Sequence, residues 1–184
     1  MGTSLKKVAK KAKDYKYVLL VMRHAKTEPF GDGGDAGREL TDKGRKQAKA
    51  SPKAWPRTRW CRRALRAPAP PGPGRPAIAC LRCSATTRRS TIVRVCTKVG
   101  CSRYLTSLPR PRRSIAELLV LGHEATVSIA CQWLASSESD AMLLDMLNLG
   151  MSPASLAVFG SNEPFNQWQL HSGELIRIAD GQGF

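Results

Sequence analysis

The first long run of apolar positions is Tyr17–Thr27, YVLLVMRHAKT, which stops at an Arg-His pair. An apolar, β-branched run of about six residues between charged residues predicts a strand buried on both faces, as in parallel sheets. Arg23 and His24 would then lie at its C-terminal end, where open α/β sheets bind ligands. A guanidinium can bind phosphate or carboxylate, and a neutral imidazole can act as nucleophile or base. The alternative is that Arg23 caps the strand and His24 is an ordinary loop residue.

The segment that follows this strand predicts a loop and then a helix. Residues 28–38 contain four glycines, which would let the loop fold over a ligand. Thr41 can cap the next helix, and Asp42 in the first turn is favourable near the positive end of the helix dipole. We expect this helix to end near Ala50.

Regular apolar spacing returns at Ser114. Residues 114–121 predict a short helical turn or linker followed by a second buried strand. Gly122 lets the chain turn sharply, which places His123 at the end of that strand. A second histidine is therefore expected at the same kind of position as His24.

The last third of the chain predicts two helices and two strands. Thr126–Leu134 and Ala141–Leu149 have helical spacing, and Gly150 stops the second helix. The first of these helices should face the sheet with Val127, Ala130, Cys131 and Leu134. Residues 155–159 and 168–178 alternate or run apolar as strands do. Together these elements predict an α/β protein, a three-layer α/β/α sandwich with a mostly parallel sheet.

The length of 184 residues suits one domain with a single core, which we place at 16–184 after a basic N-terminal arm at 1–15. The arm is expected to be solvated, with at most one weak helix through Leu5, Val8 and Ala12. No apolar run approaches the roughly 18 residues that span a bilayer. The N-terminus also lacks the apolar segment of a signal peptide. We therefore expect a cytoplasmic protein that does not associate with membranes.

The positive charge of the chain is concentrated in residues 51–113. This block holds 16 of the 30 Lys and Arg residues and no Asp or Glu, so the other 14 basic residues balance the 14 acidic ones. It also holds nine of the twelve prolines and five of the six cysteines. Residues 51–90 show no sustained helical or strand period, and the prolines exclude a helix through the centre of the block.

A GC-rich gene that is read out of frame gives this kind of composition. We therefore interpret residues 51–113 as a frameshift or a sequencing error that begins near Ala50 and is restored near Ser114. On this hypothesis the block cannot bury enough apolar surface to offset the entropy of ordering it, and it should be disordered or irregular. The sheet should then have a gap or a poorly formed strand.

The cysteines of this block offer a function of a different class. Cys80, Cys83, Cys96 and Cys101 give C-x2-C, twelve residues and C-x4-C, which is close to zinc-site spacings but outside the usual ones. Joined to the basic residues, they could form a zinc-bound nucleic-acid module inserted in the domain. We rank this below the frameshift, because the block lacks apolar periodicity and aromatic stacking residues.

Three stretches, in order along the chain, resemble the signature of the histidine phosphatase superfamily, whose fold is phosphoglycerate mutase-like. They are RHAKT from Arg23, GRELTDKGRKQA from Gly37 and LLVLGHEATVS from Leu118. RHAK, RELT and GHE are most similar to the single-domain bacterial phosphohistidine phosphatases of the SixA type. The chain departs from the family pattern over residues 51–113.

This resemblance implies a role for each matching residue. His24 is the nucleophile that becomes phosphorylated, and Arg23 and Arg38 bind the phosphate. His123 matches the second histidine of the family, which donates to the phosphoryl oxygens in the transition state. No metal and no cofactor are expected, because guanidinium groups supply the positive charge that a metal would bring.

The sequence assigns no single role to three further residues. The family's remaining arginine lies in a Ser-Ser-Ala-x-Arg-Thr stretch, of which Ser84–Thr91 keeps only part. Arg88 is therefore either that phosphate-binding residue or a chance similarity in an Arg-rich block. Glu124 is either a proton donor for the leaving group or a first-turn helix residue favoured by the dipole. His171 matches no motif and is expected at the surface.

The resemblance implies a phosphatase that works through a phosphohistidine intermediate. Phosphohistidine releases an imidazole that leaves readily once it is protonated, so the lack of a strong acid favours phosphohistidine on a protein as the substrate. The alternatives are a small-molecule phosphomonoesterase of the same superfamily, an impaired or inactive member, and the nucleic-acid module. The expected partner is a phosphorylated protein or a small phosphate ester, and we do not expect nucleic acid.

Overall fold

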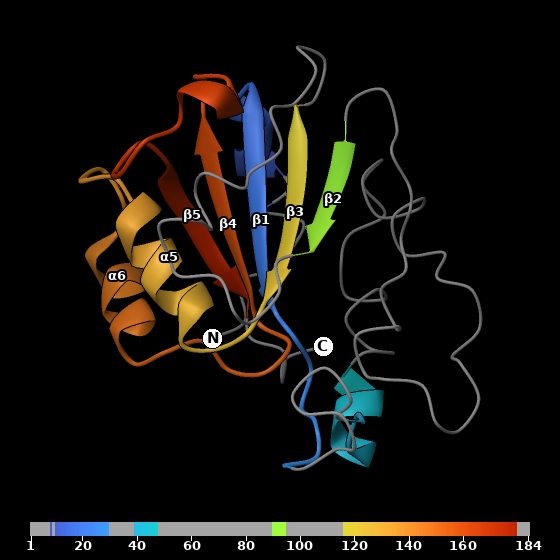
Figure 1. Cartoon of the computed structure of the whole chain (residues 1–184). Helices are drawn as coiled ribbons and strands as arrows, with labels where there is room; N and C mark the ends of the chain where they lie inside the picture. The colour runs from blue at the N-terminus through green and yellow to red at the C-terminus, as the bar shows by residue number, and fades with distance from the viewer. Residues whose placement is uncertain (1–7, 9, 30–38, 48–89, 95–115, 180–184) are drawn as a thin grey trace.

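The computed structural model describes residue 8 and residues 10–29, 39–47, 90–94 and 116–179, and for 90–94 it describes the backbone. The frame of this part of the chain is one five-stranded sheet in the order β2-β3-β1-β4-β5 (Figure 1). The strands are β1 (Tyr17–Arg23), β2 (Ser90–Arg94), β3 (Glu117–Gly122), β4 (Leu156–Ser161) and β5 (Glu174–Ala179).

The central strand is β1, which pairs in parallel with β3 and antiparallel with β4. β2 extends the parallel side beyond β3, and β5 pairs antiparallel with β4. Four strands therefore run in one direction and β4 is reversed, which confirms the predicted mostly parallel α/β sheet. The five residues inside β1 are all buried, as expected for a strand covered on both faces.

Helices α5 (Thr126–Leu134) and α6 (Ala141–Asn148) cover one face of the sheet (Figure 1). Alternate residues of the strands point toward them, namely Leu19, Val21, Leu118, Val120, Ala157, Phe159 and Leu175. The predicted face of α5 is confirmed, because Val127, Ala130, Cys131 and Leu134 are all buried. Asp140 caps α6 by accepting from the Met142 amide at 2.8 Å. Among the described residues, no helix has the length and apolar character needed to span a membrane.

The N-terminal segment contributes to the core on the other face of the sheet. Val8 and Ala12 are buried in one cluster with Val18, Leu20 and Met22 of β1. The short 3-10 helix η1 (Ala12–Asp14) then leads into β1. The expectation of a solvated arm is therefore wrong at these two apolar residues. Both faces of the sheet are covered, as the predicted three-layer architecture requires.

Residues 51–113 contribute β2, at the edge of the sheet. The backbone of Ser90–Arg94 pairs in parallel with β3, in a register that places Ile92 opposite Leu119. The expectation that this block is irregular and leaves a gap in the sheet is therefore wrong for these five residues. The rest of the expectation, for 51–89 and 95–113, lies outside the described residues.

Candidate active site

His24 and His123 lie side by side at the C-terminal ends of the neighbouring parallel strands β1 and β3. The register pairs Arg23 with Gly122, so the residues that follow leave the sheet together. The His24 amide donates to the Gly122 carbonyl at 3.0 Å, which continues the ladder by one residue. The ring centroids of the two histidines are 4.2 Å apart, with 50° between the ring planes. Two histidines that are far apart in sequence thus form one site.

The ring of His24 is held in one tautomer by the backbone. Its Nδ1 lies 2.7 Å from the carbonyl oxygen of Ala25. A carbonyl oxygen can only accept, so Nδ1 carries the proton, and in the neutral ring the lone pair is on Nε2. The His24 carbonyl in turn accepts from the Ala154 amide at 3.1 Å. Neighbouring residues of the same chain therefore fix both the backbone and the protonation pattern of His24.

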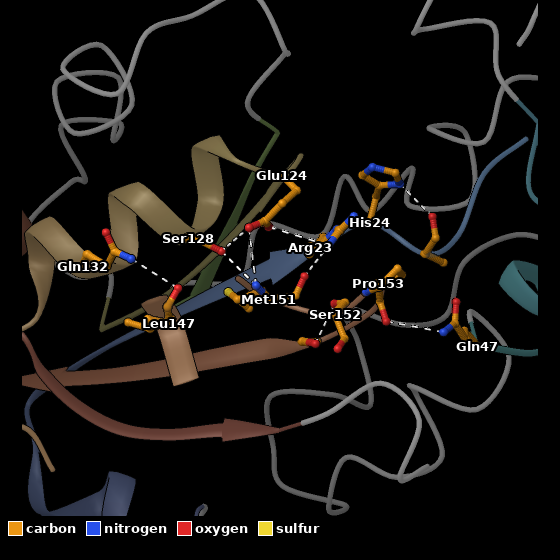
Figure 2. A network of polar contacts seen from close by, with 12 residues as sticks. Arg23, His24, Gln47, Glu124, Ser128, Gln132, Leu147, Met151, Ser152 and Pro153 are labelled. Atoms are coloured by element: carbon orange, nitrogen blue, oxygen red, sulfur yellow. Dashed lines mark hydrogen bonds and ion pairs between the residues drawn. The ribbon is translucent and has the colours of Figure 1, made fainter. Parts of the chain in front are cut away.

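Arg23 is the last residue of β1, and its side chain reaches the turn that follows α6 (Figure 2). Its Nη1 donates to the Met151 carbonyl and lies 3.9 Å from Oε2 of Glu124. Its Nε is buried and makes no hydrogen bond within the described part of the chain. A buried, charged donor without an acceptor is costly, and an oxyanion would satisfy it.

Glu124 immediately follows His123 and is fixed by two donors. Its Oε1 accepts from the Ser128 hydroxyl, and the Met151 amide donates to the same oxygen at 3.4 Å (Figure 2). The Met151 amide also donates to Oγ of Ser128 at 2.9 Å. The carboxylate is thus an acceptor between the start of α5 and the turn after α6.

The helix at 42–47 begins as predicted and supports the loop that follows His24. Oγ1 of Thr41 accepts from the Gly44 amide at 2.9 Å, which confirms the predicted cap. Buried Gln47 accepts from the Lys26 amide at 3.1 Å and donates to the Pro153 carbonyl at 3.4 Å. Sequence analysis did not single out Gln47, because a glutamine near the end of a polar helix gives no signal of burial.

The remaining predicted binding residues lie outside the described residues. They are Arg38, Arg88 and the cysteines of the zinc alternative, Cys80, Cys83, Cys96 and Cys101. Where the structure is described, no group of three or more His, Cys, Asp or Glu side chains is arranged to hold a metal ion.

Two other residues with reactive side chains are not part of this site. Burial raises the pKa of the Cys131 thiol, which lies in the core of α5, so a thiolate nucleophile is disfavoured there. His171 is exposed, as predicted. Its Nδ1 lies 3.0 Å from the Ala135 carbonyl and its amide donates to the Trp133 carbonyl, so it caps the C-terminal end of α5.

No family model and no curated protein sequence matches this chain. Solved structures share its fold, and three of them show the extent of the likeness. One, provisionally named phosphohistidine phosphatase SixA, from Nakamurella multipartitia, has 20% sequence identity and a TM-score of 0.57 over 89% of this chain and 95% of its own. A second with the same provisional name, from Agrobacterium tumefaciens, has 16% identity and a TM-score of 0.56 over 90% and 99%. The third, the protein histidine phosphatase SixA complexed with tungstate, has 13% identity and a TM-score of 0.54 over 90% and 98%.

The likeness extends over most of each of these chains, so it concerns the whole architecture and not one motif. The predicted histidine phosphatase fold is therefore confirmed: this chain has the fold of the SixA phosphohistidine phosphatase structures.

Proposed function

We propose that this chain is a cytoplasmic phosphatase that removes phosphate from phosphohistidine on a protein, by way of a phosphohistidine on its own His24. The observation that carries the proposal is the pair of His24 and His123 rings, 4.2 Å apart at the carboxyl edge of the sheet. The solved structures of the same fold bear the name of phosphohistidine phosphatase, which supports the same assignment. One of them is complexed with tungstate, an oxyanion with the tetrahedral shape of phosphate.

The tautomer of His24 supports its role as the nucleophile. With the proton on Nδ1, held by the Ala25 carbonyl, Nε2 offers its lone pair to phosphorus. As the bond from Nε2 to phosphorus forms, the bond from phosphorus to the leaving nitrogen breaks, and the leaving imidazole takes a proton. Water then attacks phosphorus, which releases inorganic phosphate and returns His24 to the neutral ring.

The groups around His24 suit a transferring phosphoryl group. Arg23 ends the same strand and has a buried Nε donor that no described residue uses, so it can bind a phosphoryl oxygen. His123 can donate a ring N–H to the charge that develops on these oxygens. Arg38 and Arg88 would add guanidinium groups if they match the family's pattern.

Labelling with a small phospho-donor tests the nucleophile. Incubation with acetyl phosphate should leave an acid-labile, base-stable phosphate on His24, and His24→Ala should abolish it. His171→Ala is a matched control, because it also removes one imidazole but lies at the far end of α5. It should label as the wild type does. Label on serine or cysteine, or equal labelling of His24→Ala, would reject the assignment.

A further inference from the structure

We propose that Glu124 is a positioning residue that holds the guanidinium of Arg23 so that its remaining donors meet the phosphoryl group. The inference rests on the proposed phosphatase function and deepens it. It also argues against the interpretation of Glu124 as a proton donor, because a residue in this role does not protonate the leaving group.

The carboxylate of Glu124 is anchored from the side opposite Arg23. Its Oε1 takes the hydrogen bonds of the Ser128 hydroxyl and the Met151 amide. Gly150 has a φ of 85°, and a Cβ there would lie 3.1 Å from the same oxygen, so the backbone approaches Glu124 closely. Gln132 of α5 ties the last turn of α6 to α5, because its Nε2 donates to the Leu147 carbonyl at 3.2 Å (Figure 2). The anchor is therefore part of the packed helices.

The second oxygen of Glu124 faces Arg23. Oε2 lies 3.9 Å from Nη1 and, like Nε of Arg23, is buried without a hydrogen bond among the described residues. Met151 links both partners, since its amide donates to Glu124 and its carbonyl accepts from Arg23. Carboxylate and carbonyl together restrain one edge of the guanidinium. The planar fork is then oriented, with Nε left for an oxyanion.

The same contacts make Glu124 an acceptor on both sides. Its Oε1 takes the two anchoring hydrogen bonds and its Oε2 faces the guanidinium of Arg23, so both oxygens are directed at donors of the protein itself. In this arrangement Glu124 neutralises Arg23 when the site is empty and orients it when phosphate binds.

Glu124→Gln tests the proposal through the sign of its effect on anion binding. An amide has one acceptor oxygen, whereas both carboxylate oxygens face donors here. Losing the restraint on Arg23 should weaken tungstate binding about ten-fold, measured by calorimetry on the full chain. If Glu124 had no positioning role, removing a negative charge beside an oxyanion site would strengthen binding. Unchanged or tighter tungstate binding therefore overturns the proposal.

Two substrates separate positioning from proton donation. The kcat/KM of Glu124→Gln should fall by a similar factor for p-nitrophenyl phosphate and phenyl phosphate, although their leaving groups differ in basicity. A fall confined to phenyl phosphate would identify Glu124 as an acid and overturn the proposal. Glu163→Gln is the matched control, because it loses the same charge at an exposed residue after β4, next to the N-terminal end of β1 and therefore at the end of the strand opposite His24.

A measurement that needs no turnover separates this proposal from the phosphatase function. The side-chain Nη–H signals of Arg23, which face the Met151 carbonyl and Glu124, should exchange slowly in a nitrogen-15 spectrum of the wild type and rapidly in that of Glu124→Gln. If the wild type binds no tungstate but shows this difference, the phosphatase function fails and the positioning role stands. An identical Arg23 signal in both proteins overturns the positioning role. Should Glu124→Gln not fold, Ser128→Ala keeps the charge, removes one donor to Oε1 and should weaken tungstate binding two- to three-fold.

Discussion

Gly44 is buried where the helix at 42–47 contacts the chain that leaves His24. A Cβ at this position would lie 1.9 Å from the carbonyl oxygen of Lys26, a contact that no side chain can make. The obstacle is backbone and not the end of a flexible side chain, so the helix itself would have to move. The same helix carries Gln47, which holds the Lys26 amide and thereby the loop after His24.

Gly44→Ala should therefore lower both stability and activity. Overpacking of a close contact costs on the order of 1–3 kcal/mol of unfolding free energy, which urea denaturation can measure. Lys43→Ala is the control on the same helix, because Lys43 is exposed, and it should stay within about 0.5 kcal/mol of the wild type. Equal stability of the two variants would contradict the close approach of helix and loop.

A polar cluster holds the N-terminal segment against the sheet. It consists of Lys11, Tyr15 and Glu174. The Tyr15 hydroxyl donates to Glu174 at 2.5 Å, and Lys11 donates to the same carboxylate at 3.0 Å. The Tyr15 ring lies over Gly160, where a Cβ would meet it at 2.4 Å. Burial and then the bond to Glu174 raise the pKa of Tyr15. Burial alone would raise the pKa of Glu174, but the hydrogen bonds from Tyr15 and Lys11 outweigh it and lower that pKa.

A lowered pKa at Glu174 predicts a specific pH dependence. The folded state favours the charged carboxylate, so this contribution to stability is present above the pKa of the unfolded chain, about 4.3. It is lost as the pH falls through the lower pKa of the folded state. The unfolding free energy of Glu174→Gln should therefore be lower than that of the wild type by on the order of 1 kcal/mol at pH 7. This difference should shrink below about pH 4. A difference that stays constant from pH 7 to pH 3 would contradict this prediction, and Glu163→Gln serves as the exposed control.

Elements whose signal is local could be predicted, and those that depend on distant contacts could not. β1, β3 and α5 each carry a sustained apolar pattern, so their positions and the two histidines at the strand ends follow from the sequence. β2 contains only Thr91, Ile92 and Val93 as a β-branched run, too short to indicate a strand without its pairing to β3. Burial of Val8 and Ala12 likewise depends on the far face of the sheet. The contacts of Glu124 could not be predicted from the sequence either, because they depend on the position of the turn after α6.

At the scale of the whole molecule, the origin of residues 51–113 bears on whether the candidate site is complete. The block has 63 residues, about a third of the 184 in the chain. The structure describes only Ser90–Arg94 of it, as the backbone of β2. Arg88, the candidate for a further phosphate-binding arginine, lies outside the described residues. The frameshift and the inserted nucleic-acid module therefore stay alternative predictions.

The gene can decide this last question. If two compensating shifts lie near codons 50 and 114, an alternative frame between them should be open and should encode acidic residues and alternating helix and strand patterns. It should also contain an arginine in a Ser-Ala-x-Arg-Thr setting, where the present frame has Arg88 among Ser84–Thr91. A chain rebuilt in that frame should bind tungstate at least ten-fold more tightly, because one more charge-assisted hydrogen bond is worth roughly 1.5–3 kcal/mol. Stop codons in both alternative frames, or open frames without such patterns, would show that the block belongs to the native protein.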